Sequence, residues 1–246
     1  MKHTIDWRIG CSGFYYKEWK EIFYPAGLPQ RLWFQHYCKY FNTLELNASF
    51  YRFPTLAGLQ KWFSSSPADF IFSVKAPRLI THYKKFIGAE QQITDFYAVV
   101  REGLGHKLGA VLFQFPPQVQ YTAQLLQTIV NSIDPSFNNV LEFRHSSWWC
   151  RDVFETLGRH STSFSGSSHP KLPDTLIINT PRVYYRFHGV PVLFRSAYEK
   201  SFLKRRADEI LTAGNVNTAF LYFNNTAGPA ALANAQWLQE YISEKK

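Results

Sequence analysis

The feature that most constrains the fold is an alternation of short strand-like runs with helix-like stretches along the 246 residues. The strand-like runs are apolar, and apolar residues recur at every third or fourth position in the stretches between them, as on one face of a helix. Eight such alternations in about 250 residues are typical of a (β/α)8 TIM barrel of the α/β class. The expected strands are 7–11, 43–49, 70–75, 110–115, 140–144, 161–165, 183–188 and 218–224.

The intervening stretches predict helices, and no linker or repeat interrupts them, so we expect a single domain over residues 1–246. A doubly wound open sheet is the alternative, but the first turn, Gly10-Cys-Ser-Gly13, lacks the glycine spacing of a dinucleotide site. The sixth unit is the weakest, because 161–165 is poor in β-branched residues and 165–173 is typical of a loop. The expected helices are 30–41, 56–63 (with Thr55 as its N-cap), 90–104, 122–133, 152–157, 201–211 and 227–242.

The composition favours a well-packed protein with an anionic partner. Hydrophobic residues make up 46% and charged residues only 18%, which predicts a sizeable core. The net charge of +9 raises the expectation of phosphate-bearing partners. The charges are dispersed, however, and the densest runs, Lys84-Lys85 and Lys204-Arg205-Arg206, are short. A small anionic substrate is therefore the first expectation, and nucleic acid is the alternative partner.

The cysteines and the hydropathy pattern indicate the cellular setting. Three cysteines without CxxC spacing predict no disulfide framework. The opening residues 1–6 are not an apolar signal segment, and no run approaches the roughly 18 apolar residues of a membrane span. We expect a cytoplasmic protein without a membrane partner.

Polar residues interrupt the apolar strands in a regular way. Residues two apart on a strand point to the same face of the sheet. In a (β/α)8 barrel, the chemistry takes place at the carboxyl ends of the strands and on the loops that follow. Three pairs of polar residues fit this pattern, namely Glu45 with Asn47, Glu142 with Arg144, and Arg186 with His188.

The charged strand residues carry a surplus of positive charge. Lys75, Arg144 and Arg186 outnumber Glu45 and Glu142. Arginine binds phosphate and carboxylate bidentately, so we expect these three cations to hold an anion. The alternative is an ion-pair network that only closes the end of the barrel, but buried ion pairs stabilise a fold weakly.

The acid/base candidates are Glu45, Glu142 and His188. A neighbouring guanidinium favours an ionised carboxylate and a neutral imidazole. We therefore expect Glu142 to be charged and His188 to be neutral. The same three residues, with His82 or His145 nearby, are an alternative set of ligands for a divalent ion. Three cations in the same site would oppose a metal, so no cofactor is predicted.

Aromatic and amide side chains complete the predicted substrate site. Tyr16, Trp19 and Tyr51 follow the first two strands, where they would stack on a base or sugar, or else form an apolar lid. Asn224 and Asn225 follow the last strand and precede the last helix, whose amino end would attract a phosphate. The alternative is that Asn225 or Thr226 simply caps that helix.

Motifs along nearly the whole chain resemble the YecE-like family, the domain of unknown function numbered seventy-two. The resemblance implies a TIM-barrel fold and no established activity. Two positions depart from the family pattern: Ser165-Gly-Ser-Ser-His169 has no acidic residue, and Ser146 replaces a proline. The matching motifs are Ile9-Gly-Cys-Ser-Gly-Phe-Tyr-Tyr-Lys-Glu-Trp19, Phe41-Asn-Thr-Leu-Glu-Leu-Asn-Ala-Ser-Phe-Tyr-Arg52, Phe72-Ser-Val-Lys-Ala-Pro77, Lys107-Leu-Gly-Ala-Val-Leu-Phe-Gln-Phe-Pro-Pro117, Glu142-Phe-Arg-His145, Tyr185-Arg-Phe-His-Gly189 and Phe223-Asn-Asn-Thr-Ala227.

The sequence therefore predicts an uncharacterised TIM-barrel enzyme. Its expected substrate is a small anion that bears a phosphate or a carboxylate; a nucleotide-like molecule is one such substrate. We expect it to bind at the carboxyl-terminal face of the barrel. The alternative is a nucleic-acid-binding protein or a repair-type phosphodiesterase without clear metal ligands.

Overall fold

The computed structural model describes residues 4–245, so the first three residues of the opening segment lie outside the described part. The chain separates into two compact units. The first unit consists of Met1–Glu45 and Gly166–Lys246, and the second unit is the continuous segment Leu46–Ser165.

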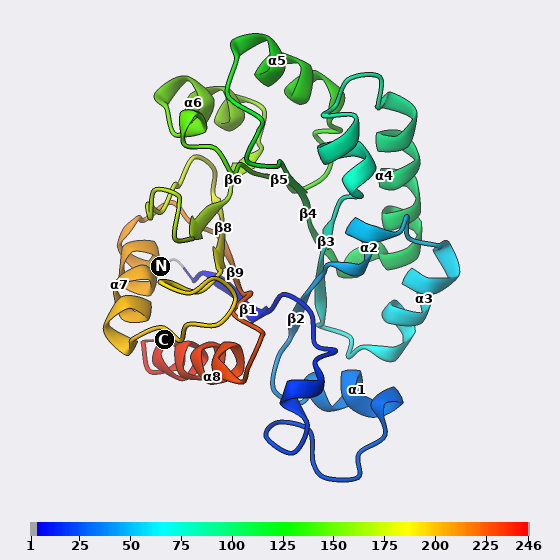
Figure 1. The fold of residues 1–246 in the computed structure, drawn as a ribbon, viewed down its shortest axis with the longest axis vertical. Helices are drawn as coiled ribbons and strands as arrows, with labels where there is room; N and C mark the ends of the chain where they lie inside the picture. The colour runs from blue at the N-terminus through cyan, green and yellow to red at the C-terminus, as the bar shows by residue number, and fades with distance from the viewer. Residues whose placement is uncertain (1–3, 246) are drawn as a thin grey trace. The chain divides into compact units, whose positions relative to one another are not determined.

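The first unit contains the first strands and the last strands of the chain. Its strands pair in the order β2-β1-β9-β8-β7, and the registers of β1 with β2 and β9, and of β8 with β7 and β9, are parallel. Helix α8 packs on β1, on β9 and on α7 (Figure 1). The elements are β1 (Asp6–Cys11), α1 (Trp33–Tyr37), β2 (Thr43–Leu46), β7 (Gly166–Ser168), β8 (Arg182–Phe187), α7 (Lys200–Thr212), β9 (Thr218–Phe223) and α8 (Ala230–Ser243), with the short helices η1 (Lys17–Trp19) and η2 (Gln30–Leu32).

The second unit repeats the alternation of strand and helix. Its strands pair in the order β3-β4-β5-β6, all parallel. Helices α3 and α4 lie side by side (Figure 1), and a Cβ atom at Gly103 would come within 2.4 Å of Leu59 Cβ, so only glycine permits this contact. The elements are α2 (Ala48–Tyr51), α3 (Leu56–Ser65), β3 (Ile71–Lys75), η3 (Leu79–Tyr83), α4 (Glu90–Leu104), η4 (Gly105–Lys107), β4 (Leu108–Gln114), α5 (Ala123–Ser132), β5 (Asn139–Glu142), η5 (Ser146–Trp148), α6 (Arg151–Arg159) and β6 (Ser163–Phe164).

Local signals in the sequence correctly predicted several helices. Helix α4 has the predicted bounds. The Thr55 hydroxyl accepts a hydrogen bond from the Gly58 amide and Thr122 caps α5 in the same way, which satisfies amide groups that have no partner within the helix.

Three local predictions were wrong. The sixth run is interrupted at Ser165, so residues 4–245 contain nine strands instead of eight, and 166–168 is not a loop. Strand β2 ends at Leu46, because Asn47 takes up helical backbone angles (φ −96°, ψ −14°) and leads into α2. Asn47 therefore does not share a strand face with Glu45. The last helix begins at Ala230 and not at residue 227.

Candidate functional site

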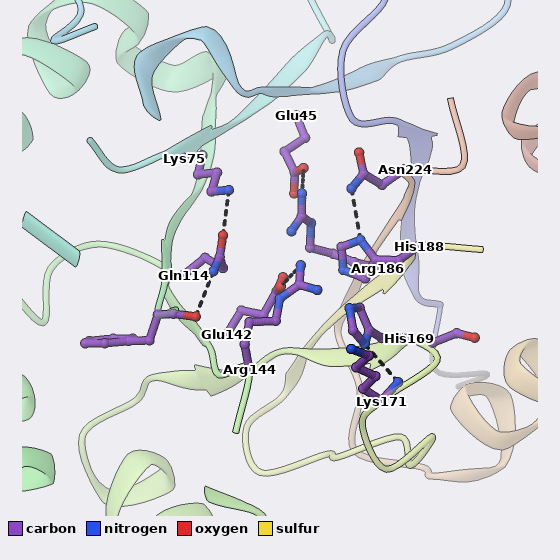
Figure 2. Close-up of polar contacts among 12 residues, drawn as sticks. Glu45, Lys75, Gln114, Glu142, Arg144, His169, Lys171, Arg186, His188 and Asn224 are labelled. Carbon is purple, nitrogen blue, oxygen red and sulfur yellow. Dashed lines mark hydrogen bonds and ion pairs between the residues drawn. The ribbon is translucent and has the colours of Figure 1, made fainter. Parts of the chain in front are cut away.

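In the first unit, a carboxylate on β2 is held by two side chains of β8. We call Glu45, Tyr184 and Arg186 the Glu45 cluster. Arg186 Nη2 lies 2.6 Å from Glu45 Oε1 (Figure 2), and the Tyr184 hydroxyl donates to Glu45 Oε2 at 2.6 Å. Burial, followed by the charge of Glu45, raises the pKa of Tyr184 well above its ordinary value, so the phenol stays a donor. Since Glu45 is buried and only 2% of the Arg186 side chain is exposed, this is a desolvated ion pair with both carboxylate oxygens occupied.

His188 follows β8 directly and is fully buried. Its Nδ1 atom lies 2.9 Å from Asn224 Nδ2 (Figure 2). An amide nitrogen can only donate, so Nδ1 is the acceptor in this contact. The imidazole ring of His169 lies 5.8 Å from that of His188, measured between centroids. Half-buried Asn224 is thus a side-chain hydrogen-bond partner of His188.

The two aromatic residues of the first loop have different environments. Trp19 is fully buried, and its indole N–H donates to the Gly228 carbonyl at 3.0 Å. Tyr16 is half-buried, donates to the Ser12 carbonyl at 2.6 Å and lies 4.8 Å from the Trp19 ring. Burial raises the pKa of the Tyr16 hydroxyl. Contrary to the prediction, Trp19 has no face open for a ligand and instead packs the loop against the core.

Asn225 anchors the loop that precedes α8. It is fully buried, and its Nδ2 atom donates to the Ser196 carbonyl at 3.0 Å and to Asn234 Oδ1 at 3.2 Å. The residue at the N-cap position of α8 is Pro229. Neither Asn225 nor Thr226 caps the helix, so the alternative expectation of a side-chain cap was wrong, and a phosphate at this helix end stays a prediction.

In the second unit, two cations, an amide and a carboxylate occupy the ends of three neighbouring strands. We call Lys75, Gln114, Glu142 and Arg144 the Glu142 cluster. Lys75 Nζ donates to Gln114 Oε1 at 2.8 Å, Gln114 is in register with Glu142, and Arg144 forms an ion pair with Glu142 (Figure 2). Glu142 is buried, whereas 13% of the Arg144 side chain is exposed. Arg144 therefore combines a buried partner with an edge that a ligand can reach.

The pKa of His82 is lowered by burial and by the charges around the Glu142 cluster. The pKa of His82 falls to about 4, first because of burial and then because of the positive charges of Lys75, Arg144 and Arg78. The edge of the imidazole also meets the Phe50 ring at 4.9 Å, and Lys75 Nζ lies 3.9 Å from the centroid of Phe50. The positive charges near the end of β3 thus add to the effect of burial on this imidazole.

The structure divides the predicted site residues between the two units. Arg186, predicted to hold an anion with Lys75 and Arg144, is instead paired with Glu45. Tyr51 is exposed at the end of α2, and Asn47 is half-buried at its start. The first unit brings together Glu45 with Arg186, His188 with Asn224, and Tyr16 with Trp19; the second unit brings together Lys75, Glu142 and Arg144.

Sequence reasoning missed two residues that shape these clusters. Tyr184 lies two positions before Arg186 on β8, so the strand periodicity already placed the two on one face. His82 was considered only as a metal ligand, because nothing in the sequence shows that three cations surround it. Within residues 4–245, no group of three or more His, Cys, Asp or Glu side chains is arranged to hold a metal ion.

Comparisons with known proteins agree with this architecture. A DUF72 protein from Thermotoga maritima MSB8 is 25% identical and superposes with a TM-score of 0.86 over 97% of this chain and 99% of its own. A DUF72 protein from Enterococcus faecalis V583 is 20% identical, with a TM-score of 0.79 over 98% and 99% of the two chains. These similarities confirm the predicted α/β fold class, a TIM-like barrel.

Sequence comparison leads to the same family. The UPF0759 protein YunF of Bacillus subtilis (strain 168) is 29% identical over 140 residues, which are 54% of this chain and 49% of that protein, so the match spans about half of the relative's length. The family model described as "Protein of unknown function DUF72" matches residues 8–246. The resemblance noted in the sequence motifs is thereby confirmed, and the chain belongs to the DUF72 family.

Proposed function

We propose that this protein is an enzyme acting on a small anionic substrate, and that the anion binds at the Glu142 cluster. The observation that carries the proposal is geometric: Lys75, held by Gln114 at the ends of β3 and β4, lies near Arg144, which pairs with Glu142 at the end of β5. The pKa of His82, lowered first by burial and then by Lys75, Arg144 and Arg78, agrees with this location. Glu142 is the one carboxylate of the cluster. A phosphate or carboxylate would neutralise the remaining positive charge.

The burial and fixed positions of the two cations support this location. Lys75 and Arg144 are largely buried, so water screens their charges less than it screens surface charges. Gln114 and the Phe50 ring hold Lys75 in place, and Glu142 orients Arg144. A cation that is already positioned loses little side-chain entropy when an anion binds, which favours affinity.

Among the acid/base candidates, we retain Glu142 and His188 and assign Glu45 to structure. Both oxygens of Glu45 already accept hydrogen bonds, from Arg186 and Tyr184, so it is poorly placed to take a proton from a substrate. His188, hydrogen-bonded to Asn224, is the acid/base candidate of the first unit, and Glu142 is that of the second unit. Tyr51 and Asn47 remain candidate substrate contacts in the second unit, and Tyr16 remains a candidate in the first unit.

The setting follows from the same proposal. We propose a cytoplasmic protein, as expected from three cysteines without CxxC spacing. None of the helices between residues 4 and 245 has the length and apolar character needed to cross a membrane. No cofactor is proposed.

Calorimetry against inorganic phosphate, pyrophosphate and citrate tests the anion site. Arg144→Lys keeps the charge but loses the bidentate geometry, and Arg144→Ala loses both. We expect Arg144→Ala to weaken binding by roughly ten- to a hundredfold, since a hydrogen bond to a charged group is worth about 1.5–3 kcal/mol, and Arg144→Lys to lie between Arg144→Ala and wild type.

The matched control for this measurement is Arg101→Ala. It removes the same charge from a surface pair with Asp134 in the same unit. If Arg101→Ala and Arg144→Ala weaken binding equally, or if wild type binds none of the three anions, the site is not at the Glu142 cluster.

A further inference from the structure

Two exposed tyrosines flank an arginine on the second unit. Tyr51 ends α2, Arg78 precedes η3 and Tyr83 ends η3; we call these three residues the tyrosine surface. The side chains of Tyr51 and Tyr83 are 70% and 63% exposed. The guanidinium carbon of Arg78 lies 5.9 Å from the ring centroid of Tyr51 and 5.4 Å from that of Tyr83. Two flat apolar faces with a cation between them are thus open to solvent.

The backbone beneath the tyrosine surface is well anchored. η3 is a single π-helical turn, a rare conformation that often marks functional sites. Lys85 and Phe86 follow with φ angles of 51° and 68°, in the left-handed region that non-glycine residues seldom adopt. Phe86 is fully buried and stacks on Phe115 at 5.3 Å. The buried ring holds the unusual turn and keeps the exposed side chains above it in place.

The surrounding segment is almost free of negative charge. Between Glu45 and Glu90 the sequence contains a single acidic residue, Asp69, and it precedes β3. After that position, residues 70–89 carry four cations and no carboxylate. Lys84 Nζ donates to the Gly88 carbonyl at 2.5 Å, whereas Lys85 is exposed. The cations are Lys75, Arg78, Lys84 and Lys85.

A contact between rings joins the tyrosine surface to the Glu142 cluster. The rings of Tyr51 and Phe50 meet edge to face, with their centroids 5.1 Å apart. Lys75 Nζ in turn lies 3.9 Å from the centroid of the Phe50 ring. Aromatic rings and cations therefore form a continuous path: Tyr83, Arg78, the adjacent rings of Tyr51 and Phe50, and Lys75. A ligand that covers this path needs flat rings as well as repeated negative charges.

We propose that the tyrosine surface binds single-stranded nucleic acid. Bases stack on Tyr51 and Tyr83, and phosphates contact Arg78 and Lys85. Single strands are bound in this way because every base offers a face for stacking while its backbone follows the cations. The inference rests on the proposed function in one respect: the strand extends a phosphate toward Lys75 and Arg144.

The test uses fluorescence anisotropy with a labelled oligothymidylate at low salt. Tyr51→Ala and Tyr83→Ala should each weaken binding roughly five- to a hundredfold, the fold-change expected from the loss of one stacked base. Tyr51→Phe keeps the ring and should bind as wild type. Tyr40→Ala removes an exposed tyrosine of the first unit, 47% exposed, and should change nothing.

A charge-matched pair separates contact from general attraction. Arg78→Gln and Arg205→Gln each remove one exposed positive charge, one at the tyrosine surface and one on α7. Arg78→Gln should weaken binding more and should lower the salt slope by about 0.7, the value for one phosphate contact on a single strand. The inference would be overturned if the two arginine variants had equal effects or if the tyrosine variants bound as wild type. It would also be overturned if wild type did not bind the oligothymidylate.

The two proposals fail in different measurements. If inorganic phosphate binds through Arg144 while Tyr51→Ala still binds the oligothymidylate as wild type, the proposed anion site is supported and the proposed role of the tyrosine surface is contradicted. If Tyr51→Ala no longer binds the oligothymidylate while wild type binds no inorganic phosphate, the proposed role of the tyrosine surface is supported and the proposed anion site is contradicted. Duplex DNA that binds wild type and Tyr51→Ala equally well would show that charge alone is responsible, and would overturn the inference.

Discussion

The Glu45 and Glu142 clusters use the same two kinds of residue in opposite ways. Each pairs a buried glutamate with an arginine at the end of a parallel strand. In the Glu45 cluster, Tyr184 takes the second carboxylate oxygen and only 2% of the Arg186 side chain is exposed. In the Glu142 cluster, 13% of the Arg144 side chain is exposed, and a second cation, Lys75, lies on β3, with β4 between it and β5. Charge that is balanced and sealed is structural, whereas surplus charge with an open edge is suited to binding.

The same substitution in both clusters gives the sharpest comparison, and Glu45→Gln should have the largest effect. It leaves the Arg186 guanidinium buried beside a neutral amide. Breaking a buried pair by removing one partner costs roughly 3–5 kcal/mol. Urea denaturation followed by circular dichroism should show that loss in the free energy of unfolding.

The control for Glu45→Gln is the double variant Glu45→Gln with Arg186→Met. It removes both charges and should recover part of the lost stability. A single variant that unfolds at the wild-type urea concentration would contradict the structural role of the Glu45 cluster.

Glu142→Gln should have a smaller effect on the fold. Arg144 has an exposed edge and can turn toward water, so we expect a loss of about 1–2 kcal/mol, at the lower end for hydrogen bonds to charged groups. The same change should strengthen phosphate binding, because it removes a carboxylate that competes for Arg144. Urea denaturation and phosphate calorimetry on one preparation measure both effects. Equal destabilisation by Glu142→Gln and Glu45→Gln would erase the distinction between the clusters.

The pH dependence of stability should show the smallest effect. His82 has a folded pKa of about 4 against an ordinary 6.5, so the unfolded chain binds the proton more tightly. Its contribution is complete above pH 6.5 and is lost as the pH falls toward 4. The side chain is partly exposed, so solvent screening reduces the contribution to about 1 kcal/mol. Urea midpoints between pH 4 and 7 should fall less steeply with acid in His82→Gln than in wild type.

Phosphate adds a second outcome to the same titration. An anion held by Lys75 and Arg144 offsets the charges that depress the pKa of His82. Saturating phosphate should therefore raise that pKa in an NMR titration of the imidazole. A pKa of His82 that is the same with and without phosphate would place the anion away from the Glu142 cluster.

The sequence predicted the features that short-range rules control. Strand periodicity and helix caps such as Thr55 act within a few residues, so the order of elements and the bounds of α4 were correct. The break at Ser165 and the turn at Asn47 were missed, because they depend on packing that the local pattern does not encode. The pairing of Arg186 with Glu45 joins residues 141 positions apart, so the sequence offered no reason to choose Glu45 over Glu142.

The separation of Glu45 from Arg186 in the sequence has a consequence for folding during protein synthesis. The second unit is one continuous segment, so all of its residues emerge in a single stretch of synthesis. The first unit instead consists of two segments: Glu45 ends the early one, and its partners Tyr184 and Arg186 lie on β8 in the late one. Domains fold as units while the chain is being made. We therefore expect the middle of the chain to become protease-resistant while the early strands still await their partners from the end of translation.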